Sequence, residues 1–144
     1  MALAVFRYML VAFFVVAGIN HFRDPDFYLR MMPPYIPAHR FMIAFSGISE
    51  IVAAILLAVP RTSRAGAWFI IALLVIFFTV HIYMLQETNG IFQGIPTMGL
   101  VIRIIMQFIL IGWAWLYTRS PEAIAAASAP KVEIPEPEEV SDTD

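Results

Sequence analysis

The chain has 144 residues, of which 60% are hydrophobic and only 14% are charged, and its formal net charge is −2. So few charged side chains cannot cover the surface of a water-soluble domain of this size, and they offer no basic patch for a nucleic-acid partner. The sequence contains no cysteine, which excludes disulfide frameworks and thiolate metal sites.

The charges divide the chain at Arg119. Eight of the nine basic residues and four of the eleven acidic residues lie at or before this position, so the first part carries about +4 and the rest about −6. The segment after Arg119 contains alanine, proline and acidic residues and no aromatic residue, a composition typical of disorder. We therefore predict a transmembrane domain over residues 1–119 and a disordered acidic tail over residues 120–144.

Four apolar stretches are long enough to cross a bilayer as helices, since one span needs about 20 residues. They cover residues 2–21, 41–59, 65–85 and 97–117. They lack the alternation of barrel strands, and no small-residue cleavage pattern follows the first, so we expect it to be a span and not a signal peptide. The sequence predicts an all-α, multi-pass membrane protein built as an antiparallel four-transmembrane-helix bundle.

The first loop is predicted to be structured. Asp24 can cap a short helix that has Pro25 at its first position. The prolines of "MMPPYIPAHR" predict a stiff, extended connector after this helix. The apolar residues of the short helix and its end are expected to bury in the membrane interface. They are Phe27, Tyr28, Met31 and Met32.

The two ends of the predicted bundle differ in their number of basic residues. One end carries Arg7, Arg61, Arg64, Arg119 and Lys131, and the other carries Arg23, Arg30 and Arg40. Because Lys and Arg are enriched on the cytoplasmic side of membrane proteins, we expect a cell-membrane protein with both termini in the cytoplasm. The first loop then lies on the outer side.

Several strongly polar residues interrupt the predicted spans, and antiparallel threading places them in the outer half of the membrane. No residue among them is assigned a catalytic role. The local spacings of metal motifs, such as H-x-x-x-H or E-x-x-H, do not occur, so no metal site is expected. The candidate pocket residues are Asn20, His21, Ser46, Glu50, His81, Arg103 and Gln107.

Arg103 and Glu50 are predicted to form an ion pair. A guanidinium group cannot lose its charge, and in hydrocarbon that charge costs several kcal/mol unless it is paired or hydrated. Glu50 is the only acidic residue within a predicted span. The pair either fixes the register of the bundle or forms, with His21 and His81, a pocket that binds a polar ligand head or moves a proton. The histidines can equally be core residues with satisfied hydrogen bonds.

Three stretches, "AGINHFRDPDFYLRMMPPYIP", "SGISEIVAAILLAVPRTSRAGAW" and "HIYM", resemble the DoxX family of small four-helix membrane proteins, over about residues 16–117. The resemblance implies the four-helix fold and a role beside membrane redox systems, as in the membrane subunit of a thiosulfate:quinone oxidoreductase, or in the assembly of other membrane proteins. His21 and Glu50 fall within the matching segments. As a hypothesis, the loop over residues 18–40 is a lid over the outer-half polar pocket.

Two functions follow as hypotheses, and the sequence does not choose between them. The first is an accessory or quinone-interacting subunit of a membrane redox system, in which Glu50 and Arg103 orient a quinone carbonyl and a histidine carries the proton. No intrinsic cofactor is evident, so electrons would come from a redox protein partner. The second is a non-catalytic membrane scaffold or assembly factor that packs against another membrane protein, with the acidic tail binding a basic partner. A small transporter is less favoured because no internal repeat is visible.

Overall fold

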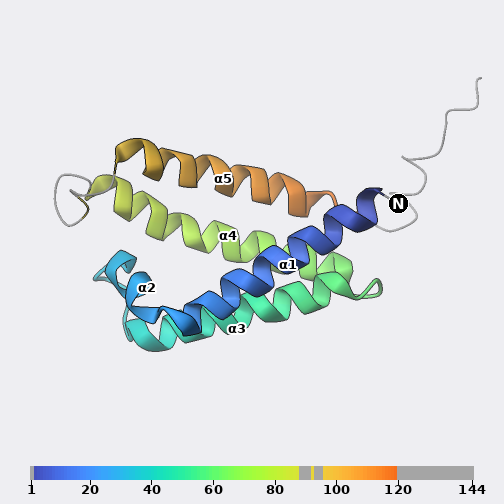
Figure 1. Cartoon of the computed structure of the whole chain (residues 1–144), viewed down its shortest axis with the longest axis horizontal. Coiled ribbons are helices and arrows are strands. Elements are labelled where there is room, and N and C mark those ends of the chain that lie inside the picture. The colour runs from blue at the N-terminus through green and yellow to red at the C-terminus, as the bar shows by residue number, and fades with distance from the viewer. Residues whose placement is uncertain (1, 88–91, 93–95, 120–144) are drawn as a thin grey trace, which may run out of the picture.

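The computed structural model describes residues 2–87, 92 and 96–119, and these residues form five α-helices and no strand. Four of the helices are long and apolar enough to cross a membrane, which confirms the predicted all-α, multi-pass fold (Figure 1). The predicted tail, residues 120–144, lies outside the described residues. The helices are α1 (Ala2–Arg23), α2 (Pro25–Met31), α3 (His39–Ala58), α4 (Ser63–Gln86) and α5 (Thr97–Trp115).

The four long helices follow one another in space in an antiparallel arrangement. α1 packs along α3, α3 along α4 and α4 along α5. α1 runs obliquely across this row, as Figure 1 shows. Near its beginning it meets the end of α5, where the Tyr117 hydroxyl donates to the carbonyl oxygen of Leu3 at 3.0 Å and the rings of Phe6 and Trp113 lie 6.2 Å apart. At its other end α1 lies against α3 and α2, so α1 and α5 diverge toward the α2 end.

Two glycines allow α1 and α3 to cross at close range. A Cβ atom on Gly18 would lie 2.7 Å from the carbonyl oxygen of Gly47, and one on Gly47 would lie 2.8 Å from the Cβ atom of His21. Small residues at such a crossing let helix backbones approach in membranes, where packing drives association. Three residues beyond each glycine, on the same helix face, stand His21 and Glu50. The crossing therefore brings these two side chains together.

The short helix α2 begins as predicted. The Asp24 side chain accepts a hydrogen bond from the backbone N–H of Phe27 at 3.1 Å, and Pro25 occupies the first helical position. Pro is well suited there because the first N–H of a helix has no intrahelical partner. The cap fixes the direction of α2 immediately after α1 ends at Arg23.

The connector after α2 differs from the predicted extended form. The N–H of Ile36 donates to the carbonyl oxygen of Pro33 at 3.1 Å, which closes a turn. His39 Nε2 lies 3.0 Å from the same oxygen, and α3 already begins at His39. The prolines do exclude a helix, but a fixed φ also suits the corner of a turn. The connector thus folds back and holds α2 over the end of the bundle.

Candidate functional site: an apolar cavity with polar groups from four helices

A cavity of about 370 Å³ lies between all five helices and the connector. Most of the side chains around it are apolar. Six of the seven candidate pocket residues line it, namely His21, Ser46, Glu50, His81, Arg103 and Gln107. Asn20 does not line it, because its side chain is exposed and its amide donates to the hydroxyl oxygen of Tyr28 at 3.2 Å. The antiparallel packing of the four spans therefore places polar groups from four helices around one cavity.

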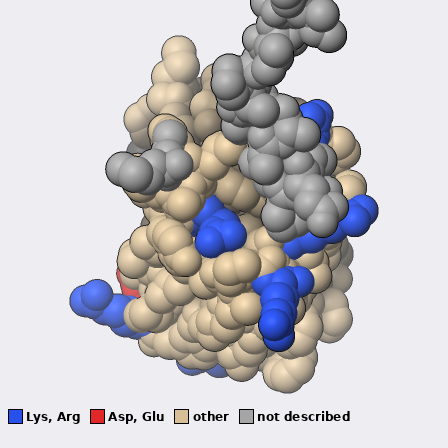
Figure 2. Space-filling view, turned by 90° about the vertical axis from the view of Figure 1, so that its right-hand side faces the viewer, with Lys and Arg blue, Asp and Glu red and all other residues tan. Residues whose placement is uncertain are grey.

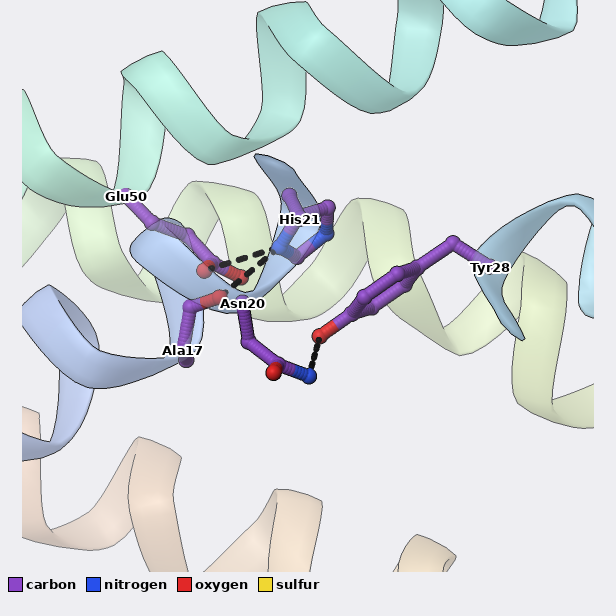
Figure 3. A network of polar contacts seen from close by, with 5 residues as sticks. All are labelled: Ala17, Asn20, His21, Tyr28 and Glu50. Carbon is purple, nitrogen blue, oxygen red and sulfur yellow. Dashed lines mark hydrogen bonds and ion pairs between the residues drawn. The ribbon is translucent and has the colours of Figure 1, made fainter. Parts of the chain in front are cut away.

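His21 and Glu50 face each other across the crossing of α1 and α3 (Figure 3). Both are buried, with 7% and 4% of their surfaces exposed. His21 Nδ1 lies 2.9 Å from the carbonyl oxygen of Ala17 and 3.6 Å from Glu50 Oε2. Because a carbonyl oxygen only accepts, the Nδ1 atom carries the proton of the bond to Ala17, which leaves Nε2 as an acceptor. An imidazole and a carboxyl group so close together can share a proton and can exchange it with a third group that enters the cavity.

Tyr28 of α2 covers His21. Its ring stacks on the imidazole with ring centroids 3.8 Å apart and planes inclined by 21°. Burial raises the pKa of the Tyr28 hydroxyl above its usual value, so the group is a neutral phenol. Its oxygen accepts from Asn20, and its own proton remains available to a neighbour in the cavity. Tyr28 thus fixes the histidine ring and adds a donor to the site.

The predicted ion pair between Glu50 and Arg103 is wrong. Among the described residues, the titratable group within 4 Å of the Glu50 carboxyl is the imidazole of His21, and Glu50 Oε2 has no hydrogen-bond partner. Glu50 faces His21 of α1 where α1 and α3 cross at Gly18 and Gly47. The carboxyl group therefore presents a buried acceptor that is not satisfied by the described residues, an unusual condition for a folded protein.

Arg103 instead lies beneath α2. Its Nη1 atom is 3.5 Å from the sulfur of Met31, and its guanidinium carbon lies 5.8 Å from the centre of the Phe27 ring. A thioether sulfur is a weak acceptor, and a guanidinium over an aromatic ring gains only a modest attraction. The fixed charge of Arg103 is therefore only weakly compensated by its neighbours in the described structure.

The remaining polar candidates are held by the backbone of the bundle. The buried amide of Gln107 donates to the carbonyl oxygen of Leu74 and so links α5 to α4. His81 Nδ1 lies 3.0 Å from the carbonyl oxygen of Phe77 on its own helix, which again leaves Nε2 as an acceptor. Ser46 is half-buried at the α3 wall. These three residues shape the polar part of the cavity.

The cavity reaches the surface of the bundle within the membrane-spanning segments. Four of its lining side chains are also well exposed and apolar, and they come from α1, α4 and α5, where α1 diverges from α5. They are Phe13 (46% exposed), Ile76 (61%), Ile102 (52%) and Met106 (43%). An exposed apolar side chain in a span faces lipid, so a lipid-soluble molecule can enter sideways from the bilayer.

The sequence suggested the loop over residues 18–40 as a lid over the pocket, but it did not predict that side chains of α2 line the cavity itself. Four apolar side chains were predicted in the membrane interface, and all four line the cavity instead, namely Phe27, Tyr28, Met31 and Met32. Their apolar character suits either place, so composition alone could not separate the two. The available signal was the cap at Asp24, which starts a helix one residue after α1 ends and so directs it back over the bundle.

Comparisons with known proteins give one family. The model of the family described as "Domain of unknown function (DUF8561)" matches residues 10–118. This match covers every residue that lines the cavity. No curated protein matches the chain, and no solved structure matches it.

Proposed function

The chain belongs to the DUF8561 family, and we propose that it is an accessory, quinone-interacting subunit of a membrane redox system. The observation that carries the proposal is a cavity whose mouth is apolar and lies in the spans and whose far wall carries His21, Glu50 and Arg103. Small-molecule sites commonly have volumes of about 300–1,000 Å³, mostly apolar walls and a few converging polar groups. An isoprenoid quinone has the matching chemistry, with an apolar tail and a polar ring.

The resemblance of the first loop and of α3 to the DoxX family, some members of which serve quinone-linked enzymes, supports the same proposal. The chain itself supplies proton chemistry and not electrons, since none of its side chains is a redox cofactor. A partner redox protein would therefore exchange electrons with the bound quinone.

The polar groups suit the proton steps of quinone chemistry. Reduction of a quinone takes up two electrons and two protons, and its oxidation releases them. A hydroquinone hydroxyl can donate to the Glu50 carboxyl group, which lines the cavity, and this carboxyl group can share a proton with the neighbouring His21. Arg103 of α5 can stabilise negative charge on the second ring oxygen. His81 of α4 can accept a hydrogen bond from a ring hydroxyl at its free Nε2 atom.

The binding prediction uses a short-chain quinone titrated into the protein in mild detergent and followed by calorimetry. Glu50→Gln removes the ionisable acceptor, and a charge-assisted hydrogen bond contributes more than a neutral one. We expect the affinity to fall about tenfold, or about 1.4 kcal/mol, and His81→Ala to weaken binding as well. Ile55→Ala on the lipid-facing side of α3 is the matched control and should bind as the wild type does.

Failure of the wild-type protein to bind any quinone would contradict the proposal. If one membrane protein then copurifies with the chain in fixed ratio, the second function, a scaffold or assembly factor, takes its place.

We also propose that both termini lie in the cytoplasm of a cell-membrane protein. Four arginines lie at the bundle end where α1 begins, α3 turns into α4, and α5 has ended, and Figure 2 shows basic side chains around this end. They are Arg7, Arg61, Arg64 and Arg119. The described acidic residues precede α2, begin it, end α4 or line the cavity. Such an asymmetry favours a cytoplasmic location for the arginine-rich end.

Single cysteines test this orientation, because the natural chain has none. Pro37→Cys and Pro60→Cys are a matched pair, since both prolines are exposed and lie at opposite ends of α3. An impermeant maleimide applied to intact cells should label position 37 and leave position 60 unlabelled until the cells are opened. Labelling at position 60 and not at position 37 would show that both termini lie outside the cytoplasm.

A further inference from the structure

Arg103 is the fixed charge of the cavity, and the described structure does not neutralise it. It stands six residues after the start of α5 at Thr97, about 9 Å along the helix, and lines the cavity. Among residues 2–87, 92 and 96–119, no carboxyl group lies within ion-pair distance of it. Its contacts are a thioether sulfur and an aromatic ring. Both are weak partners for a full positive charge.

Glu50 does not supply the missing charge. Its carboxyl group is turned to His21 across the α1–α3 crossing, at 3.6 Å. The two groups can share a proton and so remain neutral or paired without Arg103. The exposed acidic residue Asp26 of α2 lies 3.8 Å from Arg40, at the surface. These two acids are thus engaged elsewhere, and a charge within a span needs an anion or water.

The contacts of α2 keep this cation facing the cavity. Met31 is buried and touches the guanidinium from above, while Phe27 lies beside it. The next residue along, Tyr28, covers His21 on the opposite wall. The short helix α2 therefore contacts two different polar groups of the cavity. One is Arg103, which always carries a positive charge, and the other is the pair of His21 and Glu50, which can exchange a proton.

From this arrangement we infer that the cavity selects an amphipathic ligand whose head carries an ionised oxygen, which pairs with Arg103. The inference rests on the proposed function, because it takes the cavity as the quinone site, and it narrows the ligand to acidic heads. A hydroxyquinone ionised at its ring hydroxyl carries this chemistry, and so does a long-chain carboxylate. A neutral quinone offers Arg103 only a carbonyl oxygen, which is a weaker partner than an anion.

The test compares two quinones that differ in one group. The first is a 3-alkyl-2-hydroxy-1,4-naphthoquinone, which is an anion at neutral pH, and the second is its methyl ether, which is neutral. The wild-type protein is expected to bind the hydroxy compound at least tenfold more tightly than the ether. Arg103→Gln should bring this ratio close to one while changing the affinity for the ether less than threefold. Arg103→Lys, which keeps the charge, should retain a preference of several-fold.

The control is Arg30→Gln, which removes an exposed arginine of α2 at the same end of the bundle. It should leave the tenfold ratio unchanged. Thermal unfolding of Arg103→Gln without ligand checks that the variant folds, and its melting temperature should equal or exceed that of the wild type because an uncompensated charge is gone.

The outcomes separate the inference from the proposed function. Equal binding of both quinones to the wild type, or an unchanged preference in Arg103→Gln, overturns the inference and leaves quinone binding intact. If neither quinone binds, the proposed function fails. In that case a twelve-carbon fatty acid that binds the wild type and not Arg103→Gln still supports the anion site, and its failure to bind overturns it.

Discussion

Replacement of Gly66 by alanine is expected to lower the free energy of unfolding by about 3 kcal/mol, the upper part of the range for overpacked sites. Gly66 lies in the first turns of α4, where α4 packs against the end of α3. An added Cβ atom would lie 2.7 Å from the carbonyl carbon of Leu56 and would also collide with the backbone nitrogen of Leu57. Backbone atoms cannot rotate away as a side chain can, so the α3–α4 hairpin must open.

Gly112→Ala is the matched control for this prediction. A Cβ atom there would meet nothing within 4 Å, and alanine is favoured over glycine in a helix by about 0.5–1 kcal/mol. Unfolding of both variants should be followed in the same detergent. If Gly66→Ala is as stable as Gly112→Ala, α3 and α4 do not approach as closely as described.

The second large effect concerns the pair formed by His21 and Glu50. His21→Leu leaves the buried carboxyl group without its described partner, which costs about 2 kcal/mol. Glu50→Leu should cost less, because His21 keeps its hydrogen bond to Ala17. The double leucine variant should lose clearly less than the two single variants together, with a coupling energy of about 1 kcal/mol.

The same cycle on Glu50 and Arg103 is expected to be additive within about 0.5 kcal/mol, as for residues that do not touch. Thermal unfolding of all variants in one detergent provides both coupling energies. A large coupling between Glu50 and Arg103, with none between His21 and Glu50, would reverse the assignment of partners made from the structure.

The spans and the cap were predictable because their signals are local. Span length follows from hydropathy, and the ends of the four predicted windows lie within about two residues of the helix ends. The N-cap at Asp24 follows from three adjacent residues. Each of these features depends on the chain within one or two turns, where residue type and backbone preference decide the outcome.

The partner of Glu50 was not predictable by the same reasoning. The antiparallel order of the spans places His21, Glu50 and Arg103 in the same half of the membrane, but it does not fix how each helix is rotated about its axis. Charge complementarity favoured Arg103, while the close crossing at Gly18 and Gly47 selected His21. The signal was present in the sequence, since each glycine precedes its polar residue by three positions. Its meaning depended on knowing that α1 and α3, and not α3 and α5, make the closest crossing.

We propose that a quinone head occupies the cavity between the five helices. Photolabelling tests it most directly, with a short-chain quinone that carries an aryl azide on its ring, followed by mass spectrometry of the labelled peptides. The label is expected on α2 and on residues 102–106 of α5, and excess unlabelled quinone should suppress it. Label confined to the lipid-facing side of α3, at Ile48 and Ile55, and not displaced by unlabelled quinone would contradict the claim.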